Sequence, residues 1–171
     1  TARALGKLGW LRDTVIVDSL SSDGTADIAT TFGNVRMFRR PFTTHADQWT
    51  FGLTQTGITT EWVLAIDADY VLTDALVREI HELNASVNTA GFAAAFDYCV
   101  DGRPLRGAAY PPVTVLYRRA RAHYEQDGHT QRVRVDGEVR LLSNRVAHDD
   151  RKSLSHWLAA QARYMQLEAA K

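Results

Sequence analysis

An apolar stretch that ends in two carboxylates constrains the fold of this chain more than any other feature. Residues 62–66 form an unbroken apolar run, which favours a strand buried on both faces of a sheet. Asp67 and Asp69 follow directly, and because alternate strand residues point to the same face, both are expected to project to one side. Two like charges there repel each other and lose hydration, so a divalent cation would relieve both costs.

Carboxylate oxygens are hard ligands, and the pair Asp67 and Asp69 therefore predicts a site for Mn²⁺ or Mg²⁺. A second interpretation is purely structural: the strand turns into a helix, and Asp69 or Thr73 caps that helix. An isolated Asp-x-Asp favours the structural interpretation, whereas the sequence on either side of this pair favours the metal site.

Strand and helix patterns alternate through the first half of the chain. They are expected in turn at residues 14–18, 23–32, 35–38, 45–56, 62–66 and 73–83. This order predicts an α/β fold with a mostly parallel, Rossmann-like sheet, right-handed crossovers and flanking helices. Ligands bind such sheets at the carboxyl ends of the strands, so Asp18 and Asp67 are expected to face one crevice.

The pattern becomes β-rich after residue 88. Strand-like segments at 91–100, 113–118 and 131–142 predict a mixed or antiparallel extension of the sheet. A final amphipathic helix is expected from Ser153 to Ala170, either packed on its own domain or lying on a membrane surface. We therefore predict one domain over residues 1–171, with an alternating strand-helix half at 1–88 and a β-rich half at 89–171.

Charge and cysteine content narrow the class of protein. Lys and Arg together number 20, as do Asp and Glu, so no nucleic-acid partner is predicted. The single cysteine, Cys99, excludes an internal disulfide and fits the reducing cytoplasm. No apolar stretch reaches membrane-spanning length, and no signal peptide is evident. Because the chain begins without Met and inside a predicted helix, we expect a fragment that lacks the first strand of the sheet.

A longer motif around Asp18 links these elements to a known family. The segment Val17-Asp18-Ser19-Leu20-Ser21-Ser22-Asp23-Gly24-Thr25, followed further on by Asp67-Ala68-Asp69, resembles glycosyltransferase family 2 with the GT-A fold. The closer likeness is to bacterial enzymes that decorate lipopolysaccharide cores and related cell-envelope glycans. The resemblance implies an inverting, metal-dependent transfer of sugar from a nucleotide-diphosphate donor, usually a UDP-sugar, to a glycan or lipid-linked acceptor. It also implies a nucleotide-sugar-binding half at residues 1–88 and an acceptor-side half with the last helix at 89–171. The enzyme is expected to be cytoplasmic, with peripheral contact at the inner membrane face through that helix.

The resemblance also assigns roles to particular residues. Asp18 would hydrogen-bond the nucleotide base, and Asp67 and Asp69 would hold Mn²⁺ or Mg²⁺ on the diphosphate, with His148 completing the metal shell. The other residues expected to contact the donor are Ser19, Ser21, Asp23, Thr25, Gln48, Arg151 and Lys152.

The general base departs from the family pattern, because the catalytic acid of the family falls on Gln131, which cannot accept a proton. Asp127 and His129 lie close by in the sequence, and either is predicted to replace it. Tyr70 also departs from the family, which usually has Glu there. These departures leave open a non-catalytic binding module.

A haloacid-dehalogenase-like phosphatase is a further alternative, with Asp67 as nucleophile and Asp69 as acid/base. That chemistry needs a lysine between its acidic motifs, and the sequence has none between Lys7 and Lys152.

Overall fold

The computed structural model describes residues 1–171 except 101, 108–109, 152 and 170–171. Its elements, in order along the described residues, are α1 (Ala2–Leu5), β1 (Thr14–Asp18), α2 (Thr25–Thr30), β2 (Val35–Arg39), α3 (His45–Gln55), β3 (Trp62–Leu64), β4 (Tyr70–Leu72), α4 (Asp74–Glu82), β5 (Thr89–Ala94), β6 (Phe96–Val100), β7 (Arg103–Pro104), β8 (Val113–Arg118), a 3-10 turn (Arg119–Arg121), β9 (Ala122–Asp127), β10 (Thr130–Val135), β11 (Glu138–Leu141), β12 (Val146–Asp150) and α5 (Leu154–Ala169).

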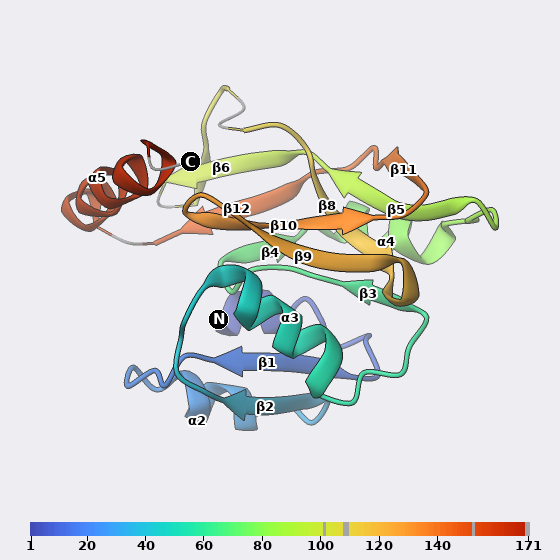
Figure 1. The fold of residues 1–171 in the computed structure, drawn as a ribbon, viewed down its shortest axis with the longest axis horizontal. Coiled ribbons are helices and arrows are strands. Elements are labelled where there is room, and N and C mark those ends of the chain that lie inside the picture. Colours follow the sequence, from blue (N-terminus) through green and yellow to red (C-terminus); the bar gives the residue numbers. More distant parts are fainter. Residues whose placement is uncertain (101, 108–109, 152, 170–171) are drawn as a thin grey trace.

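The first half folds as the sequence predicts up to residue 55. Strands β1 and β2 pair in parallel, with Asp18 opposite Arg39, and α2 makes the crossover between them. Helix α3 then packs back on β1, so closely that a Cβ on Gly52 would lie 3.3 Å from a methyl group of Val17. In Figure 1 these elements form the lower part of the molecule, below the longer strands of the second half.

Two four-stranded sheets and a hairpin make up the rest of the β-structure in the described residues. One sheet has the order β11-β5-β8-β3, the other the order β4-β12-β6-β7, and β9 pairs with β10. Strands β5 and β6 are separated by Ala95 alone, so the chain passes directly from the first sheet into the second. The predicted β-rich second half is confirmed.

The predicted mostly parallel sheet is wrong. Parallel pairs occur at β1–β2, β5–β11 and β6–β12, but antiparallel pairs join β3–β8, β5–β8, β4–β12, β6–β7 and β9–β10. The reason lies in β8, which runs antiparallel between β3 and β5 and so takes the place of a parallel neighbour. Apolar content shows that a strand is buried, but does not show the direction of its neighbours.

The strand that was expected over residues 62–66 is also shorter than predicted. It ends at Leu64, and Asp67 and Asp69 lie in a tight turn in which the Tyr70 backbone N–H donates to the Asp67 carbonyl at 3.0 Å. Because the two carboxylates lie outside the strand, strand alternation does not place them on one face. Thr73 does cap the next helix, because its side chain accepts from the Leu76 backbone N–H.

The core lies where α4 meets the two larger sheets. Its fully buried members include Leu72, Leu76, Phe92, Val115 and Val146, drawn from α4 and four different strands. Apolar burial of this kind supplies most of the stabilisation of such a domain.

Leu76→Ala is expected to lower the free energy of unfolding by about 2–5 kcal/mol, because it leaves a cavity in this core. Leu76 is 0% exposed, whereas Leu141 is 65% exposed, so Leu141→Ala serves as a matched control. The control should change stability by less than about 0.5 kcal/mol. Urea denaturation measures both, and equal effects of the two changes would show that α4 does not pack as described.

Candidate functional site

Asp18 ends β1 as a buried carboxylate that holds the following loop. Its side chain is 3% exposed, and its two oxygens accept the Ser21 backbone N–H at 3.2 and 3.0 Å. Arg39 on β2 donates from Nε at 3.2 Å. Burial alone would raise the pKa of Asp18, but the hydrogen bonds from Ser21 and Arg39 outweigh it and keep the pKa below its usual value.

The loop after Asp18 carries a backbone conformation that non-glycine residues rarely adopt. Leu20 has φ 63° and is 51% exposed. Its backbone is held there by the Asp18–Ser21 hydrogen bonds, and Gly24 (φ 74°) then starts α2. Asp23 accepts the Thr25 N–H at 3.2 Å, so the predicted donor-contacting residues shape one turn.

Gln48 brings α3 to this loop. Its Nε2 donates to the Ser19 hydroxyl at 3.0 Å. Its Oε1 is buried and has no hydrogen-bond partner among the described residues. The predicted contact of Gln48 with the donor stays a prediction, and its position beside Ser19 is compatible with it.

Sheet register brings His148 to the Asp67–Asp69 turn. His148 lies on β12 opposite Tyr70 of β4 on one side and Tyr98 of β6 on the other. Side chains opposite each other on adjacent strands point to the same face, and the His148 ring lies 4.9 Å from the Tyr70 ring and 4.7 Å from the Tyr98 ring. The Asp149 backbone N–H donates to the Asp69 carbonyl at 3.0 Å, which ties the turn to β12.

His148 connects two polar groups through its two ring nitrogens. Nε2 lies 3.4 Å from Oδ2 of Asp69, and Nδ1 lies 2.7 Å from the hydroxyl of Tyr110. Burial raises the pKa of Tyr110 to about 12, and the nearby charges of Asp67 and Asp69 add to the effect. Burial likewise raises the pKa of Tyr70, with Asp67 as the next cause. Asp67 therefore lies close to the same cluster.

Two of the three predicted metal ligands, Asp69 and His148, are in contact. Within the part of the chain that the structure describes, no group of three or more His, Cys, Asp or Glu side chains is arranged to hold a metal ion. A pair consisting of one carboxylate and one imidazole still fits Mn²⁺ or Mg²⁺ when substrate phosphates and water supply the remaining ligands. Asp67, the first residue of the turn, is half-buried.

The β9–β10 hairpin carries the predicted bases. Asp127 accepts from Arg132, at 2.8 Å from Nε and 2.5 Å from the terminal nitrogen. His129 pairs through Nδ1 with Glu168 of α5 at 2.5 Å, and its ring stacks on Tyr164 with centroids 4.4 Å apart. Gln126, which is opposite Gln131 in the hairpin, accepts the Ala46 backbone N–H, so the hairpin also contacts the start of α3.

These elements converge on one side of the molecule. Toward the left of Figure 1 lie the carboxyl end of β1, the first turn of α3, the β9–β10 turn and α5. Helix α3 contacts the β9–β10 hairpin a second time through Trp49, whose ring lies 5.5 Å from that of Tyr124 on β9. Trp49 therefore packs within the domain.

Arg151 and Lys152 are the residues that were predicted to contact phosphate oxygens. The Arg151 Nε donates to both oxygens of Asp149 at 3.0 Å, and Arg3 also pairs with Asp149. The guanidinium of Arg151 therefore has a structural partner already. Lys152 lies outside the described residues.

Sequence reasoning missed three groups of this site. Tyr98 and Tyr110 surround His148, and Glu168 holds His129. Tyr110 stands directly before Pro111 and Pro112, and this short segment was the available signal. Nothing in the sequence connects Glu168 to the hairpin.

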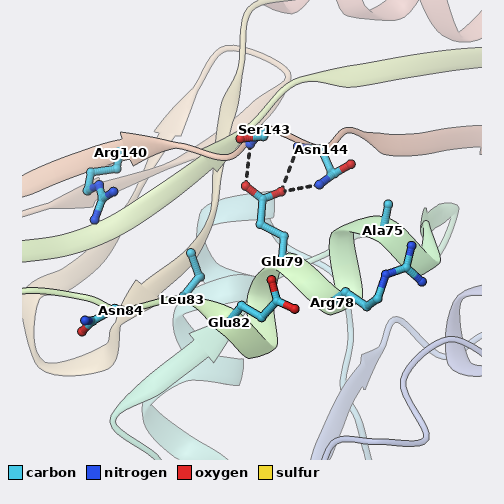
Figure 2. A pocket seen from close by; sticks show the side chains of 9 residues that line it. All are labelled: Ala75, Arg78, Glu79, Glu82, Leu83, Asn84, Arg140, Ser143 and Asn144. Carbon is cyan, nitrogen blue, oxygen red and sulfur yellow. Dashed lines mark hydrogen bonds between the residues drawn. The ribbon is translucent and has the colours of Figure 1, made fainter.

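A separate pocket lies between α4 and the turn before β12 (Figure 2). Glu79 projects from α4 and accepts the backbone N–H groups of Ser143 and Asn144 at 2.6 and 2.8 Å, as well as the Asn144 side-chain amide. None of the predicted site residues that the structure describes lines this pocket. We interpret it as a structural junction, because the carboxylate of Glu79 already accepts three hydrogen bonds that hold the turn before β12.

Comparison with models of known families shows which family the chain belongs to. Residues 11–138 match the model of the family described as glycosyl transferase family 2. The chain belongs to glycosyltransferase family 2. None of the curated proteins that were compared matches it.

Membership in glycosyltransferase family 2 confirms the resemblance stated from the sequence and implies a transferase with the GT-A α/β fold. The matched residues include the Asp18 loop, Gln48, the Asp67–Asp69 turn and the hairpin, whereas His148 lies beyond them. The likeness to lipopolysaccharide enzymes stays a prediction. Among the described residues, no helix has the length and apolarity needed to cross a bilayer.

Asp18→Asn is expected to lower the free energy of unfolding by about 1–3 kcal/mol at pH 7, because it weakens hydrogen bonds to a buried carboxylate. The folded-state pKa of Asp18 is depressed, so this stabilisation is present above the ordinary Asp pKa of about 3.9 and is lost as pH falls through the folded value. The difference in free energy of unfolding between the wild type and the variant should therefore shrink as the pH falls. Denaturation between pH 3 and pH 7 measures it, and a difference that widens in acid would contradict the assignment.

Proposed function

We propose that this glycosyltransferase family 2 chain is a metal-dependent, inverting enzyme that uses a nucleotide-diphosphate sugar. The acceptor would be a glycan or lipid-linked saccharide at the cytoplasmic face of the membrane, with α5 as the element for peripheral contact. The observation that carries the proposal is the contact between Asp69 and His148 in a family 2 domain whose first strand ends in the loop-holding carboxylate Asp18. A UDP-sugar is the favoured donor, since an acid like Asp18 suits the N–H edge of uracil.

Each part of the site has a distinct task in this proposal. The loop that Asp18 holds would take the nucleoside, and Asp69 and His148 would hold Mn²⁺ or Mg²⁺ near the diphosphate. A bound divalent cation neutralises charge on the departing nucleoside diphosphate. Asp67 adds negative charge next to this pair and lies beside Tyr70 and Tyr124.

The transfer needs a base for the acceptor hydroxyl. The acceptor oxygen attacks the anomeric carbon as the bond to the diphosphate oxygen breaks on the opposite side, which inverts the centre, and the hydroxyl proton passes to the base. His129 suits this role, because Glu168 fixes Nδ1–H and leaves Nε2 to accept a proton. Asp127 remains the second candidate, although Arg132 holds its carboxylate in an ion pair.

A non-catalytic binding module is the second candidate function. The observation that favours it is that Arg132 holds Asp127 in an ion pair, while Gln131 stands at the family position. Nucleotide binding without sugar transfer or donor hydrolysis would distinguish this module from an enzyme. Family membership favours a transferase over the phosphatase considered from the sequence.

Replacement of either proposed metal ligand should weaken the UDP binding that depends on a cation and leave the cation-independent part unchanged. Asp69→Asn and His148→Ala are each expected to weaken Mn²⁺-dependent UDP binding roughly tenfold or more, because each removes one protein ligand. Calorimetric titration with and without Mn²⁺ measures this effect. Asp27→Asn, an exposed change on α2, is the control and should leave binding intact. Unchanged binding in both test variants would remove the metal assignment.

The base is tested by comparing substitutions on the hairpin. His129→Gln should reduce sugar transfer by about 10²–10⁴-fold while sparing UDP binding, as loss of a general base does. Glu168→Gln should reduce it less, since it only loosens the orientation of His129, and Asp127→Asn should be mild. Radiolabelled-sugar transfer measures the rates. A severe loss in Asp127→Asn with an active His129→Gln would assign the base to Asp127.

A further inference from the structure

Tyr110 makes a contact with His148 that the proposed chemistry does not yet explain. Its hydroxyl lies 2.7 Å from Nδ1 of His148, and Nε2 of the same ring lies 3.4 Å from Oδ2 of Asp69. A neutral imidazole carries one ring proton, so one nitrogen donates and the other accepts. The group that faces Nδ1 therefore decides what Nε2 can do toward Asp69.

A phenol differs from the usual partners of a metal-binding histidine. A carboxylate or carbonyl oxygen can only accept, and so fixes the proton on the nitrogen that faces it. The Tyr110 hydroxyl can donate or accept. When it donates to Nδ1, Nε2–H points at the Asp69 carboxylate. When it accepts from Nδ1–H, Nε2 has a lone pair beside that carboxylate, where a cation can share both ligands.

The ring of His148 is also held against rotation. Tyr70 and Tyr98 lie on its two flanking strands, with ring centroids 4.9 and 4.7 Å away. Tyr110 and Phe96 pack on each other at 5.2 Å, which places the phenol relative to the sheet. With the ring plane fixed, a change in the role of Nε2 requires a change of tautomer and not a change of rotamer.

We propose that Tyr110 is a positioning residue that lets His148 change tautomer when a divalent cation and a nucleoside diphosphate bind. Without the cation, Nε2–H pairs with Asp69 and the Tyr110 hydroxyl donates to Nδ1. With it, the ring proton would move from Nε2 to Nδ1 by exchange with solvent, and Nε2 would serve as a ligand. Nδ1–H would then donate to Tyr110, whose own hydroxyl proton would turn to its other hydrogen-bond partner, the Tyr70 hydroxyl. This inference rests on the proposed function, because it takes Asp69 and His148 as the protein ligands. The mixed nitrogen and oxygen pair favours Mn²⁺ over Mg²⁺.

Nuclear magnetic resonance of ¹⁵N-histidine-labelled wild type tests the tautomer directly. The ring nitrogens of His148 should report the Nε2–H form in the free protein and the Nδ1–H form with UDP and Mg²⁺, the diamagnetic ion. His148→Ala assigns the signals by their loss. The same tautomer in both states would overturn the inference, even if UDP and the cation bind.

Calorimetry of Tyr110→Phe tests the consequence. This variant keeps the ring and loses the hydroxyl, so Mn²⁺-dependent UDP affinity should fall about 10- to 100-fold, as for other partners of metal-bound histidines. UDP binding without cation should stay as in wild type. Tyr117→Phe is the matched control: it removes another buried hydroxyl, which bonds Tyr124 at 2.6 Å, and should leave Mn²⁺ dependence intact.

The two arms separate failure of this inference from failure of the proposed function. If wild type shows no Mn²⁺-dependent UDP binding, the proposed metal site is wrong, and the inference falls with it. If wild type binds UDP with Mn²⁺ and Tyr110→Phe does so equally well, only the role of Tyr110 is wrong. The tautomer of His148 in the free protein can be measured whether or not UDP binds. An Nδ1–H form in the free protein would also contradict the proposed role of Tyr110.

Discussion

The pairing of β12 with two neighbours is the constraint on which the candidate site depends. Antiparallel register with β4 and parallel register with β6 put His148 directly between Tyr70 and Tyr98. The same strand anchors the turn that carries Asp69, through the Asp149 backbone N–H. A slip of one residue would send His148 to the opposite face of the sheet. The contact between Asp69 and His148 is therefore fixed by sheet register, with fully buried Val146 at the start of the strand.

Carboxylates that accept backbone N–H groups fix the loops around this framework. Asp18 holds the Ser21 turn at the end of β1, and Glu79 holds Ser143 and Asn144 at the turn before β12. Burial would raise the pKa of Glu79, but hydrogen bonds from Ser143 and Asn144 keep it below its usual value. A loop that is held in this way can present its backbone to a ligand with little further loss of conformational freedom.

Local sequence signals predicted the parts of the fold that local physics decides. The β1-α2-β2 crossover, the Thr73 cap of α4 and the position of Asp18 at a strand end follow from apolar periodicity and capping chemistry. The direction of β8 between β3 and β5, and the register of β12, depend on contacts between residues distant in sequence. For this reason the sheet was expected to be parallel, and the tyrosines around His148 were missed. The pairing of Glu168 with His129 likewise requires α5 to reach the hairpin, which no local pattern indicates.

We propose that the Asp18 loop, the Asp67–Asp69 turn and β12 form one binding site for a nucleoside diphosphate. Hydrogen–deuterium exchange with UDP and Mn²⁺ tests it most directly, because the backbone N–H groups of Ser21, Tyr70 and Asp149 all lie in these segments. We expect slower exchange in all three segments and no change around Glu79. Slower exchange confined to the α4 pocket of Figure 2, or no change anywhere, would contradict it.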